Sequence, residues 1–323
     1  MISRRRFLAS TGVAVAAPLA AGAQPSGKLP RIGVVGSGRA SRLVAFREGM
    51  RALGYVEGRN CVIEVRAVEG AYDRLPRVLT ELIALNVDVI VTSGVPSALA
   101  AKRATTVIPI VAASVGDPVG IGLVSNLARP GGNVTAISHF AADLSGKQVD
   151  LFKQAVPGLS RIGVLYNPTN PLHPEYWRDT EMAAKALSVT LVRLVVHDLD
   201  ELTRAFDVAR RERANGLLVL SDPFFNDQWM RIAKTATTAR LPLMSPYREY
   251  VEAGGLLSYG PNLDEILKRA VVYVDKILKG AKPGDLPVEQ PTKFELLINT
   301  KTAETLGLTI PPSLLGRADR LIR

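Results

Sequence analysis

Short runs of β-branched and other apolar residues alternate along the chain with longer segments whose apolar positions recur every three or four residues. The short runs predict strands at 32–35, 62–65, 87–92, 108–112 and 134–137. The longer segments predict helices at 41–53, 73–85, 97–105 and 119–127. Continuous apolar strands separated by helices are typical of a parallel sheet covered on both faces. The first part of the chain therefore predicts one doubly wound α/β lobe.

The same architecture then begins again, although the two halves share no sequence repeat. Its strands are predicted at 161–166, 190–195, 216–220 and 241–244, and its helices at 174–187, 199–211 and 226–239. The remaining residues predict a strand at 255–260, a helix at 263–278, an extended link at 283–291, a strand at 294–298 and a helix at 300–306.

This last part is too short for a third domain. We therefore expect the chain to cross back to the first lobe and to return to the second, which forms a hinge that permits closure around a ligand. The predicted first lobe comprises 30–137 with 260–288, and the predicted second lobe comprises 138–259 with 289–323.

Residues 1–23 have the pattern of an export signal. Three arginines at 4–6 precede a small, apolar run at 9–21, and Ala21-Gly22-Ala23 is a small-x-small cleavage signal. Paired arginines are typical of the twin-arginine export route. No cysteine follows the cleavage site, so we expect a mature protein that is free in the periplasm and not lipid-anchored.

The composition is that of a soluble globular protein, with 47% hydrophobic and 22% charged residues. The formal net charge is +10, but three arginines fall in the predicted signal and the other basic residues are scattered. Aromatic residues make up only 6% of the chain, too few for a long base-stacking platform. These features predict no nucleic-acid partner. Cys61 is the only cysteine, so an intrachain disulfide is excluded.

A junction of strand, small polar residue, proline and helix recurs in both halves. It occurs at 93–97, 116–118, 166–168 and 221–223, with a weaker copy at 245–246. Proline is preorganised for the first turn of a helix, and Asp, Asn or Ser before it can cap the exposed amides. Any single junction is explained by capping alone. Together they place several helix N-termini, which attract anions, at the carboxyl edges of the sheets and so predict a binding cleft.

The residues expected to bind the ligand come from both lobes: Gly36, Ser37, Ser93, Gly94, Ser97, Ser114 and Asp117 from the first, and Ser138, Asn167, Asp222, Tyr247 and Tyr259 from the second or the hinge. Hydroxyl and amide donors near Ser93 and Ser97 would hold a carboxylate. Asp117 or Asp222 could receive an ammonium group. Tyrosines would supply walls for an aromatic or apolar solute.

Signatures of an enzyme are missing from the sequence. The three histidines lack metal-ligand spacing, and there is no G-x-S-x-G elbow, Walker loop or paired catalytic carboxylates. We therefore expect no catalytic residue, metal or cofactor. The alternative is an exported periplasmic oxidoreductase with a nucleotide cofactor, because 36–41 partly matches a dinucleotide loop. Ser41 stands where the third glycine belongs, and a tight turn before a helix is the favoured explanation of this loop.

Five longer segments carry a family resemblance: LGYVEGRN at 53–60, VGDPVG at 115–120, LARPGGNVT at 127–135, LPVEQPTKF at 286–294 and LGLTIPP at 306–312. They resemble the ABC transporter substrate-binding proteins of the group that includes tryptophan- and tyrosine-type solute receptors, related to type I periplasmic binding proteins. The resemblance runs from about residue 30 to the C-terminus.

That resemblance implies two lobes joined by three crossovers and solute capture in the cleft between them. It further implies delivery to ABC permease subunits in the inner membrane, driven by a cytoplasmic ATPase. The sequence thus predicts a non-enzymatic, monomeric receptor for a small carboxylate-bearing solute, an amino acid or an aromatic acid. A lobe pair that signals without transport remains a further possibility.

Overall fold

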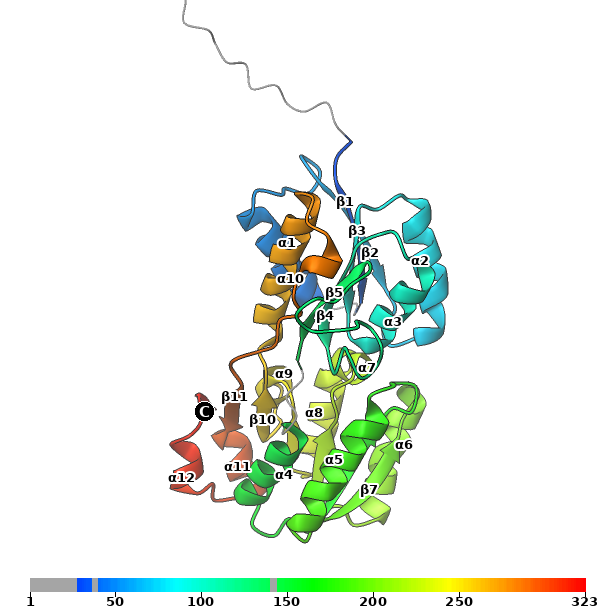
Figure 1. The fold of residues 1–323 in the computed structure, drawn as a ribbon. Helices are drawn as coiled ribbons and strands as arrows, with labels where there is room; N and C mark the ends of the chain where they lie inside the picture. Colours follow the sequence, from blue (N-terminus) through cyan, green and yellow to red (C-terminus); the bar gives the residue numbers. More distant parts are fainter. Residues whose placement is uncertain (1–27, 37–39, 140–143) are drawn as a thin grey trace, which may run out of the picture.

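The structure is a computed structural model that describes residues 28–36, 40–139 and 144–323. The predicted export signal at 1–23 and Ser37 lie outside the described residues. Figure 1 shows two α/β lobes stacked end to end.

The first lobe contains a five-stranded, fully parallel sheet in the order β2-β1-β3-β4-β5. Its strands are β1 (Arg31–Gly36), β2 (Val62–Ala67), β3 (Val89–Ser93), β4 (Ile110–Val115) and β5 (Val134–Ser138). Its helices are α1 (Ala40–Ala52), α2 (Leu75–Ala84), α3 (Val95–Ala104) and α10 (Leu263–Leu278). Helices α1 and α10 lie on one side of the sheet and α2 and α3 on the other, as the apolar strands require (Figure 1).

The second lobe contains a seven-stranded sheet in the order β12-β11-β10-β9-β8-β6-β7. Its strands are β6 (Arg161–Tyr166), β7 (Thr190–Val195), β8 (Gly216–Val219), β9 (Leu243–Ser245), β10 (Leu257–Gly260), β11 (Glu295–Asn299) and β12 (Arg320–Ile322). All neighbouring pairs are parallel except β10 and β11. Its helices are α4 (Leu144–Ala155), α5 (His173–Ala186), α6 (Leu199–Arg211), α7 (Pro223–Asp227), α8 (Trp229–Thr238), α9 (Arg248–Glu252), α11 (Thr300–Leu306) and α12 (Pro312–Leu315).

The chain crosses between the lobes three times: from β5 to α4, from β10 to α10, and after residue 286 to β11. The first and third crossings run side by side, because Ile137 and Glu289 form a parallel bridge. The backbone N–H of Ser138 donates to the carbonyl of Glu289 at 2.7 Å. These bonds tie the crossings into a hinge. The predicted fold class, two doubly wound parallel-sheet lobes joined by three crossovers, is confirmed.

The predicted helix at 119–127 is wrong, because the chain there forms consecutive turns. The carboxylate of Asp117 accepts a hydrogen bond from the N–H of Val119 at 3.2 Å, which closes a tight turn at Pro118. Gly122 then adopts a φ of +68°, in the left-handed region, so no helix can continue past it. The apolar spacing that predicted a helix instead seats Leu123 and Val124 in the core.

The helix predicted at 174–187 is confirmed as α5 with a shift of one residue, whereas the helix predicted at 226–239 is interrupted. Helix α5 starts at His173, five residues after Pro168, because Asn167 first closes a turn by accepting the N–H of Thr169 at 3.1 Å. The predicted helix at 226–239 is divided into α7 and α8 at Gln228. Among the described residues, no helix has the length and apolar character needed to cross a membrane.

Candidate functional site

A cavity lies between the lobes, where the carboxyl ends of both sheets meet. Its volume is about 20 Å³. The first lobe contributes Arg42, Ser93, Gly94, Val95, Ser114 and His139 to its lining, and the second contributes Asn170, Leu172, Tyr176, Ser221, Pro223, Asn226 and Tyr247. Because both lobes supply the walls, the cavity exists in this form only when the lobes are closed.

Arg42, in the first turn of α1, brings a positive charge to this cavity. Its side chain is only 12% exposed, and its Nη2 lies 3.6 Å from a carboxylate oxygen of Glu249 in the second lobe. The Nε and Nη2 atoms are buried, and neither has a hydrogen-bond partner among the described residues. These two atoms share one edge of the guanidinium group, the edge that binds both oxygens of a carboxylate in a bidentate pair.

Beside Arg42, hydroxyl groups from both lobes surround His139. Its Nδ1 lies 3.3 Å from the Ser114 hydroxyl, and its Nε2 lies 3.1 Å from the Tyr176 hydroxyl. Ser221 adds a hydroxyl 3.4 Å from Nε2 and shares a 2.6 Å hydrogen bond with Tyr247. Burial lowers the pKa of His139 to about 4, although a hydrogen bond to Ser114 partly opposes the shift. The imidazole is therefore neutral at pH 7.

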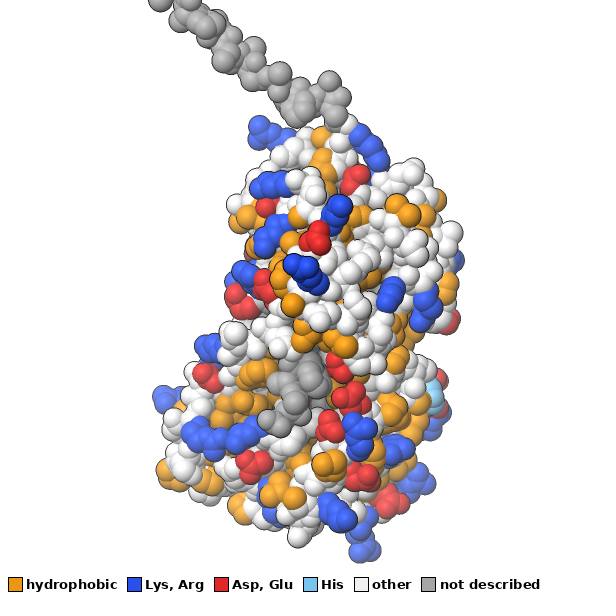
Figure 2. All heavy atoms as spheres, in the orientation of Figure 1, with side chains coloured by type: hydrophobic (Ala, Val, Ile, Leu, Met, Phe, Trp, Pro, Cys, Tyr) orange, Lys and Arg blue, Asp and Glu red, His pale blue; other side chains and the backbone are white. Residues whose placement is uncertain are grey.

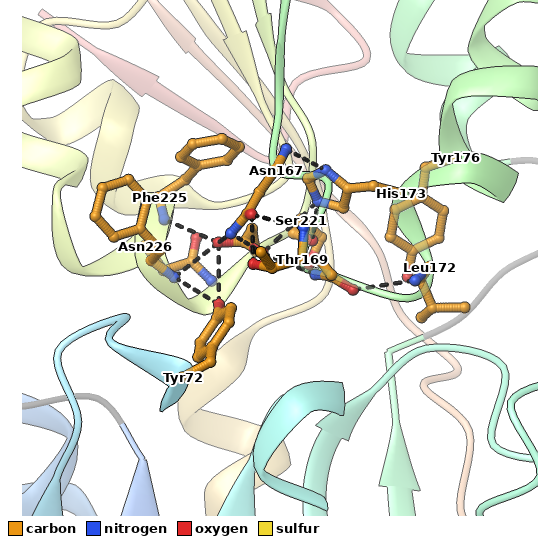
Figure 3. A network of polar contacts seen from close by, with 12 residues as sticks. Tyr72, Asn167, Thr169, Leu172, His173, Tyr176, Ser221, Phe225 and Asn226 are labelled. Atoms are coloured by element: carbon orange, nitrogen blue, oxygen red, sulfur yellow. Dashed lines mark hydrogen bonds and ion pairs between the residues drawn. The ribbon is translucent and has the colours of Figure 1, made fainter. Parts of the chain in front are cut away.

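The second lobe's side of the cleft is organised around the carboxylate of Asp222, which is fully buried. It caps α7 by accepting the N–H groups of Phe224 and Phe225 at 2.8 and 3.3 Å, with Pro223 in the first turn as predicted. Two further donors, the amides of Asn170 and Asn167, reach it at 2.8 and 3.3 Å. Figure 3 shows Tyr72 approaching this cluster from the first lobe, and its hydroxyl donates to Asp222 at 3.2 Å.

His173 stabilises the same cluster by contacting the backbone of two of its loops. Its Nδ1 accepts the backbone N–H of Asn167 at 2.8 Å, so its proton is on Nε2, which faces the carbonyl of Ser221 at 3.3 Å. Burial lowers the pKa of His173, and the nearby Asp222 charge only partly opposes this shift. The imidazole thus acts as a neutral spacer that fixes the loop carrying Asn167 against the loop carrying Ser221 (Figure 3).

Glycines of the first lobe allow the second lobe to approach closely. A Cβ atom added to Gly116 would lie 2.0 Å from Leu172 Cδ1 and 2.5 Å from the Tyr176 hydroxyl. Added to Gly94 it would lie 2.4 Å from Pro223 Cγ, and added to Gly70 it would lie 2.4 Å from Phe224 Cδ2. All three glycines belong to the first lobe and all four neighbours to the second. Absence of a side chain at these positions is what lets the cleft close this far.

The residues that the sequence singled out fall into three groups. Ser93, Gly94, Ser114 and Tyr247 line the interlobe cavity. Gly36 lines a second, apolar cavity in the first lobe, and Ser138 lines a third at the hinge. The others, Ser97, Asp117, Asn167, Asp222 and Tyr259, line none of these cavities.

Each of those five has an internal role in the structure. The Ser97 hydroxyl is turned back onto its own helix, where it donates to the carbonyl of Ser93 at 2.7 Å. Asp117 closes its turn, while Asn167 and Asp222 bond to each other. Tyr259 lies at the hinge, with its ring 6.0 Å from that of Phe294 and its carbonyl accepting from Gln148.

Sequence reasoning missed Arg42, His139, Tyr176 and Ser221. His139 follows β5 directly and Ser221 stands two residues after the end of β8, so the rule that selected polar residues after strands could have found them. Arg42 and Tyr176 carried no such signal, because each lies within the first turns of a helix and reaches the cavity through a long side chain. In residues 28–36, 40–139 and 144–323 no group of three or more His, Cys, Asp or Glu side chains could hold a metal ion.

The basic surface matches the scattered arrangement expected from the sequence. Figure 2 shows Lys and Arg side chains spread over both lobes of the face in view and interleaved with Asp and Glu. On that face they form no continuous stripe of the kind that tracks a phosphate backbone.

Comparison with known proteins gives a consistent result. Residues 33–322 match the family model described as ABC transporter substrate binding protein. A tyrosine-binding protein of Clostridioides difficile is 26% identical over 264 residues, covering 81% of this chain and 75% of that protein. Residues of a conserved domain protein of Vibrio cholerae superpose with a TM-score of 0.83 at 30% identity, covering 91% of this chain and 100% of the other.

A third relative was solved with a bound solute. The ABC domain of a Streptococcus pneumonia protein in complex with L-Trp superposes with a TM-score of 0.82 at 26% identity, covering 91% of this chain and all of the other. These relatives give no support to the alternative of an exported oxidoreductase.

Proposed function

This chain belongs to the ABC transporter substrate-binding protein family, and from that premise we propose that it captures a small carboxylate-bearing solute between its lobes. The solute is an amino acid or an aromatic acid, held by hinge closure. The protein delivers it from the periplasm to ABC permease subunits in the inner membrane, powered by a cytoplasmic ATPase, and performs no catalysis itself.

The observation that supports a carboxylate is Arg42. A buried cation whose N–H groups lack partners is costly, so the site is stabilised by an anion that accepts both hydrogen bonds. Glu249 compensates the charge only at 3.6 Å, beyond the distance of a good hydrogen bond. The hydroxyls of Ser93, Ser114 and Tyr247 line the same cavity and supply further donors for carboxylate oxygens.

Capture by closure follows from the two-sided lining. A solute that contacts Arg42 on the first lobe and Ser221 or Tyr247 on the second binds fully only in the closed state. It therefore shifts the population toward that state. The relatives named for tyrosine and solved with L-Trp support a solute of this size and class.

Thermal unfolding and calorimetry with a panel of amino acids and aromatic acids test the proposal. A true solute at one hundred times its dissociation constant should stabilise the protein by about 2.7 kcal/mol. Arg42→Gln should remove most of this stabilisation. Arg47→Gln is the matched control, because Arg47 lies on the same helix in an exposed ion pair with Glu57 and should leave binding unchanged.

The outcome against the proposal is a folded wild-type protein that responds to no member of the panel. Equal binding by Arg42→Gln and wild type would also contradict it. Uptake of the identified solute by cells lacking the protein separates transport from signalling, since a receptor that only signals leaves uptake unchanged. Mass spectrometry of the periplasmic fraction checks cleavage after Ala23.

A further inference from the structure

A second cavity continues from the interlobe site into the first lobe, beneath α1. It shares Arg42 and Ser93 with the interlobe cavity and has a volume of about 50 Å³. Beyond those two residues its lining is almost entirely apolar, with Val34 and Val65 from the sheet, Leu43 and Phe46 from α1, and Leu267 from α10. Arg42 thus stands where a polar and an apolar compartment meet.

The described lining of these two cavities carries a positive charge and no negative charge. Among the described residues that line them, Arg42 is the only one with a full charge at pH 7, since burial keeps His139 neutral. No described carboxylate lines either cavity. An ammonium group brought into this space would lose water without gaining an opposite charge, which is unfavourable.

The acidic residues nearest in the fold are already engaged. Both carboxylate oxygens of Asp222 already accept hydrogen bonds from backbone amides, asparagine side chains or Tyr72. Asp117 closes its own turn outside the lining, and Glu249 pairs with Arg42 itself.

We propose that the solute is an organic acid without an amino group, whose carboxylate binds Arg42 and whose apolar body occupies the cavity beneath α1. This inference rests on the proposed function and narrows its substrate class. It assigns the pocket formed by Val34, Leu43, Phe46, Val65 and Leu267 as the subsite that selects the apolar body. The body is buried in the first lobe, and closure of the second lobe covers the carboxylate end.

Pairs of compounds that differ only in the amino group give the test. Calorimetry compares 3-phenylpropionate with L-phenylalanine, and 3-(4-hydroxyphenyl)propionate with L-tyrosine, on the full chain. Phenethylamine, which has the amine and lacks the carboxylate, is the third arm. We expect each acid to bind at least about tenfold more tightly than its amino acid, and the amine not to bind, because an unpaired buried charge costs more than the tenfold difference requires.

Variants of one strand test the apolar subsite. Val65→Thr places a hydroxyl against the apolar body and should weaken binding of the acids about tenfold. Val62→Thr, three positions earlier on β2 and outside the lining, is the matched control and should leave binding unchanged. Circular dichroism verifies that both variants are folded.

The possible results separate the two proposals. If an amino acid binds as tightly as its matched acid in an Arg42-dependent manner, this inference is wrong while the proposed function stands. If phenethylamine binds and the acids do not, both are wrong. If Val65→Thr binds the acids like wild type, the apolar body lies elsewhere and the subsite is overturned.

Discussion

The two edges that face each other across the cleft are built in opposite ways. The second lobe presents a finished polar cluster, in which Asp222 holds two backbone amides and two asparagines, flanked by the bulky side chains of Leu172 and Tyr176. The first lobe presents glycines and Arg42, whose buried Nε and Nη2 atoms have no hydrogen-bond partner among the described residues. The polar groups of the second lobe's edge are satisfied within the protein, whereas on the proposed function the solute completes the edge of the first lobe. Specificity is therefore expected from the first lobe, and rigidity from the second.

The largest effect is expected from removing the Asp222 carboxylate, which lies at the centre of the second lobe's polar cluster. Asp222→Ala leaves two backbone N–H groups and two amides without an acceptor in a buried region. It should lower the free energy of unfolding by about 3 kcal/mol or more. Urea denaturation followed by circular dichroism measures the loss. Asp207→Ala, an exposed residue of α6, is the control and should change stability by less than about 0.5 kcal/mol. A similar small change for Asp222→Ala would show that the cluster is not a stabilising centre.

The hydroxyl cluster around His139 should make the closed form sensitive to acid. The folded pKa is about 4 against an ordinary 6.5, so below pH 6.5 the unfolded chain binds a proton that the folded chain excludes. Stability should therefore fall between pH 6.5 and pH 4, by up to about 3 kcal/mol.

Urea denaturation at a series of pH values checks this slope. His139→Gln should flatten it, whereas His197→Gln, at a half-exposed position paired with Glu201, should leave the effect of His139 in place. An identical slope in wild type and His139→Gln would contradict the assignment.

The close approach of the lobes at Gly116 can be tested without changing a residue that is proposed to bind the solute. Gly116→Ala places a methyl group against Leu172 and Tyr176, so the closed state should be disfavoured by about 1–3 kcal/mol, with a matching loss of solute affinity. The open form should keep its stability, since the clash arises only between lobes. Leu172→Ala added to the variant should restore part of the affinity. Gly158→Ala, with no atom near the added Cβ, is the control.

The smallest effect concerns the Tyr72 hydroxyl, which joins Asp222 to the first lobe. Tyr72→Phe removes a hydrogen bond to Asp222 across the cleft and should weaken solute binding by about 1 kcal/mol. Tyr55→Phe removes a similar bond to Asp275 within the first lobe and should lower stability without changing affinity. Calorimetry distinguishes the two. Equal affinity in Tyr72→Phe and wild type would mean that this bond forms in the open form as well.

The spacing of apolar residues was enough to predict most of the fold, because the strands and helices of a doubly wound sheet are continuous apolar or amphipathic runs. The failure at 119–127 arose where an aspartate side chain and a left-handed glycine override an apolar spacing that also suits buried turns. Such overrides depend on individual hydrogen bonds and leave no periodic signal.

The cleft was harder to predict than the fold. Ser93, Gly94, Ser114 and Tyr247 could be found because each stands at or just after the end of a strand. The cap at Asp222 could also be read from its proline, but its engagement by asparagines from another loop could not, since that contact joins residues 52 and 55 positions apart. Arg42 could be identified only from the structure, where its Nε and Nη2 atoms are buried and have no hydrogen-bond partner among the described residues.

The antiparallel pairing of β11 with β10 has a consequence for how the molecule is made. Helix α10 covers the first sheet, and the strands after it extend the second, so neither lobe holds all of its parts until almost the entire polypeptide has been synthesised. Domains usually fold one after another as they leave the ribosome. In this protein both lobes need the segment that follows β10. A chain that ended after β10 would lack α10 of the first lobe and the edge strands β11 and β12 of the second.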